Sequence, residues 1–540
     1  MKLKKLTLEN FRSFKGKHEI EFSPITLLFG GNSVGKSSIT KAIHHFDSLS
    51  EKDVFHGENS VTVALQFEGE MSKKFAFFDL EQFQPVELLS KDKKYFSFVE
   101  DFISHTFAIE KINKKQFGNH VEDYRSDSDS VSYNLNEQWL CKMVDGPNFK
   151  DCLLKFNSDH ELILRLGLES QLINLNKRFS SLEGESSGYV NYLINTLIEC
   201  DNADGESTYT QLKYIAKKIA YENEKLRYPI LELSSIILIL RAVNKAVISY
   251  SKLEHLGPLR KLPDIASKTS YPLELNVKRD GYFFKLGDRE RAKSYSGESA
   301  WESLTLPPLD LSTDIDVLSQ VNDWLINWFN TPYQIKFIET YSYEIDSEEK
   351  RVKLKNGQVS KEDLVGLEKK VRFLNIQNGS TTSASEIGVG ISQLTPVIVH
   401  ALDSERFSVE QPELHIHPRM QSIVADLFVF EGLYQTAGNE RGAVRISTKN
   451  LDGSMAERHF DRKEAGTESF ILIETHSEHL MLRLLKRMRE EILKPDDLAI
   501  YYFDNDCGQT KVTKIGVDQE GEFTTPWPQG FFEERLEELF

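Results

Sequence analysis

A glycine-rich stretch near the start of the chain, GGNSVGKS at Gly30 to Ser37, constrains the fold more than any other feature. It matches the pattern GxxxxGK[ST], in which backbone N–H groups converge on an anion at the start of a helix. The run Ile25 to Phe29 before it is continuously apolar, as in a strand covered on both faces. A strand, this loop and a helix in that order predict a phosphate-binding site in an α/β fold.

The residues of this loop have distinct expected roles. Lys36 should reach the β and γ phosphates of a nucleotide, and the Ser37 hydroxyl should bind Mg²⁺. ATP and Mg²⁺ are therefore the expected cofactors. The loop residues predicted to contact the nucleotide are Gly30, Gly31, Asn32, Ser33, Val34, Gly35, Lys36, Ser37 and Ser38.

A second stretch, FSVEQPELHIHP at Phe407 to Pro418, reads as a strand that ends in acidic residues and a proline. A carboxylate at the end of a strand beside the loop strand can hold the water shell of magnesium. We therefore predict that Glu410 and Ser37 bind Mg²⁺. The alternative is an ordinary solvated strand end.

Two further segments are candidates for contact with the γ phosphate. His476, in FILIETHSEH, directly follows a buried-type strand, and the alternative is a structural histidine bonded to the backbone. GVGISQLTPVI, from Gly388 to Ile398, carries paired glycines, and Ser392 is expected to open an apolar helix. Such a helix N-terminus offers a second anion site, and the alternative is a plain N-capped helix.

The chain divides into three predicted parts. Residues 1–94 carry the glycine-rich loop, residues 95–251 form a mostly helical insertion, and residues 252–540 carry the other motifs and a small C-terminal tail. Alternating apolar runs and helical periodicity predict strands at 2–9, 18–22, 60–67, 333–345, 371–376, 407–410, 470–474 and 498–503, and helices at 418–430 and 477–489.

The bulk composition is that of a soluble cytoplasmic protein. The net charge of 66 − 83 = −17 argues against a protein that binds nucleic acid along its whole surface, but it allows a local basic strip. An acidic surface that faces a basic protein partner is equally compatible with this charge. The four cysteines show no metal-ligand spacing and are expected to be reduced thiols. The opening MKLKKLTLEN does not have the pattern of a signal peptide, and no membrane span is expected.

Together these motifs resemble the ABC-type ATPase heads of the SMC, RecF and OLD branch. NFRSF at Asn10 to Phe14 is similar to their opening strand pair, and GGNSVGKSS to their Walker A motif. GVGISQ is similar to their signature, EQPELHIHP to Walker B, and ETHSEH to the switch-histidine segment. The resemblance implies that residues 1–94 and 252–540 form one such ATPase head, with a mixed sheet plus a helix-covered, mostly parallel sheet. It also implies that two heads enclose two ATP molecules. It adds these residues to those expected at the nucleotide: Arg12, Gly390, Ser392 and Gln393.

The end of the chain narrows the resemblance. WPQGFFEERLEEL and HLGPLRKLP (His255 to Pro263) are similar to prokaryotic ATPases that end in a small domain of unassigned function, among them PtuA-like ATPases of Septu and retron anti-phage systems. That resemblance implies as partners a second copy of the chain, a PtuB-type HNH nuclease and, in retrons, a reverse transcriptase with its small DNA or RNA product. The 64 residues after His476 leave little room for the Toprim nuclease domain of OLD proteins, so no intrinsic nuclease activity is expected.

The resemblance also marks Gln411 as a departure. Related heads carry a glutamate there that polarises the attacking water, and an amide cannot take the proton. Either Glu413 or a chain of water molecules supplies the base, or hydrolysis is slow. We expect slow hydrolysis, because Pro412 fixes the backbone before Glu413. The expected catalytic residues are thus Glu410, Gln411, Glu413 and His476, and the competing function is an SMC- or RecF-like ATPase acting directly on DNA in repair.

Overall fold

The computed structural model describes the segments that carry the predicted motifs of the nucleotide site, whereas residues 528–540, with most of the stretch WPQGFFEERLEEL, lie outside the described residues. The described residues are 2–46, 51–58, 60–70, 77–79, 84–86, 104–114, 130–135, 138–144, 153–157, 159, 246–247, 249–251, 253–263, 288–305, 317–343, 364–436, 444–449, 453–463 and 469–527. The predicted insertion helices between residues 160 and 245 lie outside these ranges.

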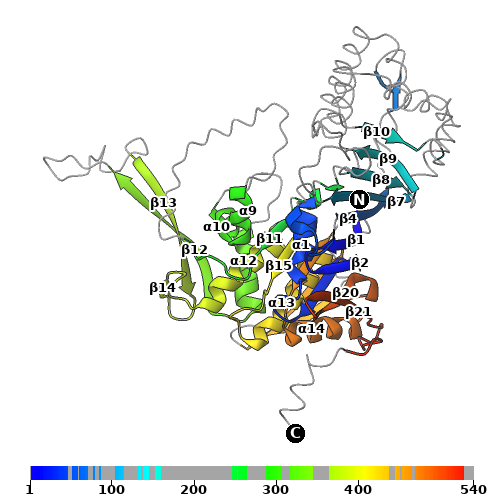
Figure 1. The fold of residues 1–540 in the computed structure, drawn as a ribbon. Coiled ribbons are helices and arrows are strands. Elements are labelled where there is room, and N and C mark those ends of the chain that lie inside the picture. Colours follow the sequence, from blue (N-terminus) through cyan, green and yellow to red (C-terminus); the bar gives the residue numbers. More distant parts are fainter. Residues whose placement is uncertain are drawn as a thin grey trace.

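The glycine-rich loop follows an inner strand of a six-stranded sheet (Figure 1). The first five strands in spatial order run parallel, and the last is antiparallel to its neighbour. The mostly parallel, helix-covered sheet is therefore confirmed. In spatial order the strands are β11 (Glu254–Leu256), β15 (Arg406–Glu410), β19 (Phe470–Glu474), β3 (Ile25–Gly30), β20 (Leu498–Asp506) and β21 (Gln509–Ile515).

A second, antiparallel sheet is built from the N-terminal part of the chain. In spatial order its strands are β10 (Leu153–Phe156), β9 (Gln138–Val144), β8 (Ser130–Leu135), β7 (Ser104–Lys114), β4 (Ser60–Glu70), β1 (Lys2–Phe11) and β2 (Phe14–Glu21), with a separate pair β5 (Phe77–Asp79) and β6 (Gln84–Val86). The prediction that helical structure begins near residue 95 is wrong, because β7 to β10 extend this sheet. β7 pairs with β4, and each of β8 to β10 pairs with the strand that precedes it in the chain. Such pairing can override the intrinsic secondary-structure propensity of a segment.

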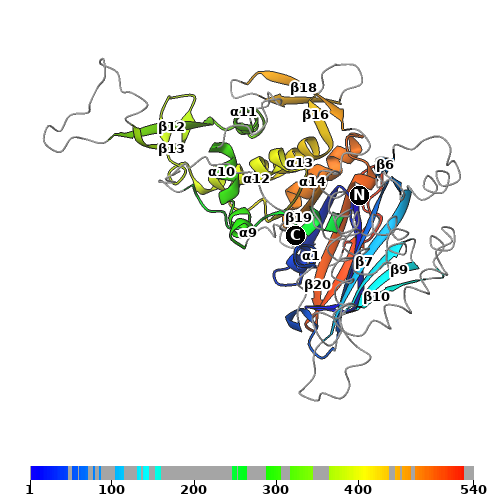
Figure 2. The ribbon, with the colours of Figure 1, turned by 90° about the horizontal axis from the view of Figure 1, so that it is seen from above.

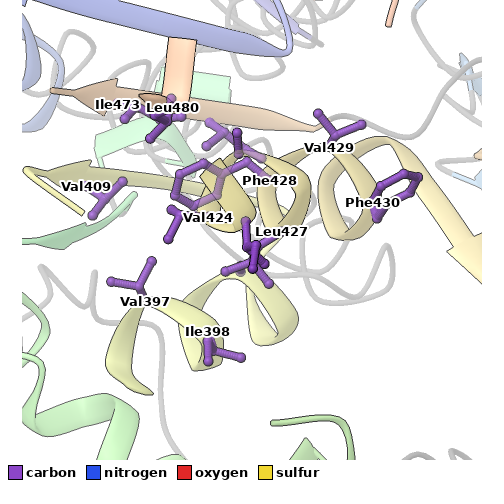
Figure 3. Packing of buried hydrophobic residues seen from close by; sticks show 14 of the residues in the cluster. Val397, Ile398, Val409, Val424, Leu427, Phe428, Val429, Phe430, Ile473 and Leu480 are labelled. Atoms are coloured by element: carbon purple, nitrogen blue, oxygen red, sulfur yellow. The ribbon is translucent and has the colours of Figure 1, made fainter. Parts of the chain in front are cut away.

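Helices flank the parallel sheet and share one core with it. In Figure 3, Val424 and Phe428 of α13 lie near Val397 of α12 and Val409 of β15, all of them buried. Each of α12, α13 and α14 begins within a predicted site segment, so this core fixes those segments relative to one another. The helices are α1 (Lys36–His44), α12 (Val389–Asp403), α13 (Pro418–Leu433) and α14 (Glu478–Arg489).

A lateral group of elements lies on the α12 side of the molecule. Figures 1 and 2 show the β12–β13 ribbon projecting there, away from β1 and β7. Among the described helices, none is both long and apolar enough to cross a membrane. The remaining elements are α9 (Asp288–Tyr295), α10 (Glu298–Thr305), α11 (Val317–Asp323), η4 (Trp324–Trp328), β12 (Tyr333–Tyr343), β13 (Leu364–Asn375), β14 (Thr381–Thr382), β16 (Tyr434–Thr436), β17 (Val444–Lys449), β18 (Met455–Arg462), η2 (Glu51–Asp53) and η6 (Pro495–Asp497).

Candidate functional site

The glycine-rich loop lies between β3 and α1, and two of its glycines are required by close contacts. Gly30 has a φ of 140°, and a Cβ there would lie 2.1 Å from the Phe503 carbonyl oxygen in β20. Gly35 has a φ of 103°, and a Cβ there would lie 2.5 Å from Thr510 Oγ1 and 2.7 Å from Ser13 Oγ. Both positions combine a positive φ with no room for a side chain, so only glycine fits.

Lys36 and Ser37, at the start of α1, both face one carboxylate. Lys36 Nζ donates hydrogen bonds to the carbonyl oxygens of Gly30 (3.0 Å) and Gly31 (2.6 Å), and it lies 3.6 Å from Glu474 Oε1. Burial lowers the pKa of Lys36, while the charge of Glu474 opposes that shift. Ser37 Oγ donates to Glu474 Oε2 at 2.7 Å. A bound phosphate would therefore compete with Glu474 for the Lys36 ammonium.

The tip of the loop faces outward. Gly31, Asn32 and Ser33 are exposed, whereas Val34 is buried beneath them and Ser38 is half-buried. The exposed backbone of the tip is therefore accessible to an anion, as the motif predicts.

Arg12, which was expected at the nucleotide, is engaged by another residue. Its Nε and Nη2 lie 2.9 Å and 2.8 Å from Asp53 Oδ1. The backbone N–H of Arg12 also donates to the Asp53 carbonyl oxygen at 2.7 Å. Contact between Arg12 and a nucleotide stays a prediction that requires this ion pair to open.

The acidic strand end lies one strand further from the loop than predicted. Glu410 was expected beside the loop strand, but β19 separates β15 from β3. The order of parallel strands in a sheet differs from their order along the chain, because crossover connections can pass over a neighbour. Glu410 and Glu474 are register partners on β15 and β19, so the two carboxylates adjoin. Burial raises the pKa of Glu474, and the charge of Glu410 adds to this shift while the Ser37 hydrogen bond opposes it.

Gln411 and Glu413 join the ends of β15 and β19. Gln411 has a φ of 45°, and its backbone N–H donates to the Glu474 carbonyl oxygen at 2.7 Å. Glu413 Oε1 accepts the backbone N–H of His476 at 2.7 Å. Burial raises the pKa of Glu413, and the His476 hydrogen bond opposes that shift. The Glu413 carboxyl group therefore connects two site segments.

His476 presents an unused nitrogen near the loop. Its ring is half-buried, and Nε2 is enclosed without a hydrogen-bond partner among the described residues. Burial lowers the pKa of His476, and the positive charge of Lys36 adds to the shift. The ring is therefore neutral near pH 7, and its free nitrogen can bond to a group held by Lys36.

Helix α12 begins one turn earlier than predicted. Gly388 takes the N-cap position with a φ of 102°, so Ser392 does not open the helix. Ser392 is only 1% exposed, and its Oγ donates to the carbonyl oxygens of Gly388 and Val389 at 3.1 Å and 3.0 Å. A Cβ at Gly390 would lie 2.8 Å from the His415 carbonyl oxygen, so this glycine lets α12 approach the loop after β15. The exposed side chain at this N-terminus is Val389.

Arg260 connects α12 to the acidic strand end. Its Nη2 donates to the carbonyl oxygens of Glu410 (2.9 Å) and Gln411 (3.3 Å). Its backbone N–H and carbonyl oxygen bond to both ends of the Gln393 amide, at 3.0 Å and 2.6 Å. Burial lowers the pKa of Arg260 to about 10, which still leaves it charged at neutral pH. Gln393 was expected at the nucleotide, but here its amide bonds to Arg260.

Four residues at this site were missed or given no role by sequence reasoning. His255 and Arg260 lie in HLGPLRKLP, a segment that resembles related ATPases but whose residues were given no chemical role. Glu474 lies inside the switch-histidine segment, and an acidic residue at the end of a buried strand could have marked it as a candidate metal ligand. Thr510 gave no signal, since it reaches the loop only through the β20–β21 hairpin, where its Oγ1 lies 2.8 Å from the Val34 carbonyl oxygen.

Comparison with known families agrees with this geometry. Residues 1–235 match the family described as AAA ATPase domain. The chain carries an AAA-type ATPase domain. Residues 493–540 match a family described as Protein of unknown function (DUF3696). No curated protein matches the chain.

Several solved SMC heads are similar to the ATPase at low identity. The Pyrococcus furiosus SMC head with an extended coiled coil, bound to the C-terminal domain of ScpA, is 12% identical with a TM-score of 0.33, over 95% of this chain and 96% of that one. An SMC head bound to the C-winged helix domain of ScpA is 12% identical with a TM-score of 0.34, over 96% and 98%. The SMC head domain from Thermotoga maritima is 10% identical with a TM-score of 0.35, over 96% and 100%.

The residues of the ATPase site fit a magnesium–nucleotide complex. Mg²⁺ prefers oxygen ligands and is usually held by one or two carboxylates together with substrate phosphates. The Ser37 hydroxyl with Glu474 and Glu410 supplies such oxygens. The glycine cradle and the unused His476 nitrogen suit the phosphates. Lys36 and the loop would bind the phosphate chain, and bound Mg²⁺ would neutralise its charge.

Replacing Glu474 with glutamine should raise the Mg²⁺ concentration needed for ATP binding about 10-fold or more, because Glu474 is the carboxylate in contact with Ser37. The measurement is a Mg²⁺ titration with a fluorescent ATP analogue, in parallel with Glu410→Gln. A wild-type midpoint for Glu474→Gln, with a shifted midpoint for Glu410→Gln, would assign the metal to Glu410 alone.

Proposed function

We propose that this protein is a slowly hydrolysing cytoplasmic ATPase whose copies close around ATP and, when closed, scaffold and regulate an HNH nuclease in prokaryotic anti-phage defence. The observation that carries the slow hydrolysis lies after β15. Gln411 has no carboxyl group, and the next one along the chain, Glu413, bonds to the backbone of His476. An amide can orient water but cannot accept its proton. ATP then acts mainly to hold the closed state together.

The N-terminus of α12 supports closure between two copies. A Cβ at Gly388 would meet nothing within 4 Å, and Val389 is 57% exposed. The N-terminal end of a helix carries a partial positive charge that favours anions. We infer that this end faces the triphosphate bound by the second copy.

Arginine at Val389 should block this closure while leaving ATP binding in each copy within about 2-fold, since Val389 lies outside the glycine-rich loop. Ser392 is unsuitable for this test, because an arginine there would replace a buried side chain. Light scattering during gel filtration, with and without Mg²⁺-ATP, measures the change in mass. The matched control is Met455→Arg on β18, a residue that is 64% exposed. ATP-dependent dimerisation of Val389→Arg equal to that of the wild type would rule out this surface.

The partner proposal rests on charge and on the resemblance of the sequence. The net charge of −17 favours a basic protein over long stretches of nucleic acid. We expect a neighbouring HNH nuclease of the PtuB type, and in a retron its reverse transcriptase with the small DNA or RNA product, to co-purify with the ATPase in an ATP-dependent manner. The alternative function is a DNA-repair ATPase. It predicts that the protein does not co-purify with the nuclease and that it binds duplex DNA with a salt-dependent affinity that ATP increases.

A further inference from the structure

The segment HLGPLRKLP, from His255 to Pro263, has no role in the proposed function, yet it lies along the acidic strand end. His255 stands in β11, the edge strand of the parallel sheet, where it is the register partner of Ser408 in β15. Its ring therefore reaches a strand whose last residue is Glu410.

His255 contacts two side chains of β15. Nδ1 lies 2.8 Å from Ser408 Oγ, and Nε2 lies 3.1 Å from Glu410 Oε1. A carboxylate can only accept hydrogen bonds, so Nε2 must carry the proton and donate it to Glu410. This donation is available to the neutral ring and to the doubly protonated ring alike. The contact with Glu410 thus does not depend on a titration.

The ring is also held from its other sides. Its centroid lies 5.5 Å from that of His44 in α1 and 5.2 Å from that of Tyr295 in α9. A Cβ at Gly257 would lie 2.6 Å from the Tyr295 ring, so this glycine lets Tyr295 pack closely against the chain after His255. The His255 and Glu410 side chains are only 20% and 14% exposed.

The same segment also fixes the backbone of the acidic strand end. Five residues after His255, the Arg260 guanidinium bonds to the carbonyl oxygens of Glu410 and Gln411. One short segment therefore holds the Glu410 side chain through an imidazole and the Glu410 backbone through a guanidinium.

We propose that His255 is a positioning residue for Glu410, fixing the orientation of its carboxylate toward the Mg²⁺–phosphate group bound at Ser37. This inference rests on the proposed ATP-binding function. Hydrogen bonds to metal-side carboxylates orient them, and loss of such a partner typically costs 10- to 100-fold in metal affinity. The competing explanation is that His255 only ties β11 to β15 through Ser408.

Two amide substitutions separate these explanations, because each keeps one of the two contacts. Glutamine at His255 can donate from about the position of Nε2 and so preserve the bond to Glu410. Asparagine is shorter, so it retains a contact with Ser408 but does not reach Glu410. For His255→Asn we expect the Mg²⁺ midpoint for binding of a fluorescent ATP analogue to rise at least about 10-fold. For His255→Gln we expect a change below about 3-fold, and for both variants an unchanged affinity in EDTA.

A double-mutant cycle tests whether His255 acts through Glu410. In a Glu410→Ala background, His255→Asn should shift the Mg²⁺ midpoint by less than about 2-fold, because the group it orients is gone. If His255→Asn does not fold, Ser408→Ala provides the same readout. That variant removes the hydroxyl that holds Nδ1, and we expect a shift of about 3-fold that also disappears without Glu410.

The outcomes distinguish this inference from the proposed function. Equal shifts for the asparagine and glutamine variants, or a shift that persists without Glu410, would show a structural role only and overturn the inference. An unchanged midpoint for His255→Asn would do the same while leaving ATP binding intact. A wild-type protein that binds no ATP analogue with or without Mg²⁺ would remove the proposed function, and the inference with it.

Discussion

Replacing Gln411 with glutamate is expected to speed single-turnover ATP hydrolysis by about 100-fold, since general-base catalysis contributes roughly 10²- to 10⁴-fold. Glutamate has the same length as glutamine and supplies the proton acceptor that the native residue lacks. The backbone contacts of this position, including the N–H bond to the Glu474 carbonyl oxygen, do not involve the substituted group. The measurement is a quench-flow time course with enzyme in excess over radiolabelled ATP.

Glu413→Gln is the matched control for this experiment. Because Glu413 bonds to the His476 backbone, its loss should disturb that segment but should not reproduce the loss of a general base. A native rate above about 1 s⁻¹, within the usual enzyme range, would end the slow-hydrolysis hypothesis. A native rate that falls about 100-fold in Glu413→Gln would identify Glu413 as the base.

Replacing Lys36 with alanine is expected to lower ATP affinity about 100-fold. Lys36 supplies a buried ammonium at the cradle, and its Nζ now bonds to the Gly30 and Gly31 carbonyl oxygens. Hydrogen bonds to charged groups contribute about 1.5–3 kcal/mol each, and 1.4 kcal/mol corresponds to about 10-fold in affinity. The loss of the ammonium and of its bonds to the phosphates therefore accounts for a decrease in ATP affinity of about 100-fold. Isothermal titration calorimetry with ATP measures the change.

Lys41→Ala serves as the control for Lys36→Ala, because it removes a lysine from the same helix at an exposed position. Its affinity should stay within about 2-fold of the wild-type value. Thermal unfolding of both variants separates lost binding from lost folding. Wild-type affinity in a folded Lys36→Ala variant would show that the loop does not hold the nucleotide.

Much of the fold around the site could be predicted because its signals are local. The apolar run from Phe470 to Glu474 and the helical periodicity after Pro418 predicted β19 and the start of α13 at the residues where they occur. Strands β7 to β10 were missed, because strands in an antiparallel sheet are stabilised by pairing with their neighbours, which the local sequence does not show. The start of α12 was missed because Ser392 is a good cap by residue type, while the backbone caps the helix at Gly388.

The sequence by itself determined the cradle. A strand, a loop with glycines at Gly30 and Gly35, and a helix that opens on Lys36 specify it through backbone geometry within a few residues. Only the tertiary structure decided which carboxylate meets Ser37. The sequence motif predicted Glu410 for this contact. In the sheet, β19 lies between β15 and β3, so Glu474 of β19 contacts Ser37 instead. Glu410 is hydrogen-bonded by His255 and Arg260. Strand order and long-range contacts arise from packing of the whole core, which no short sequence window contains.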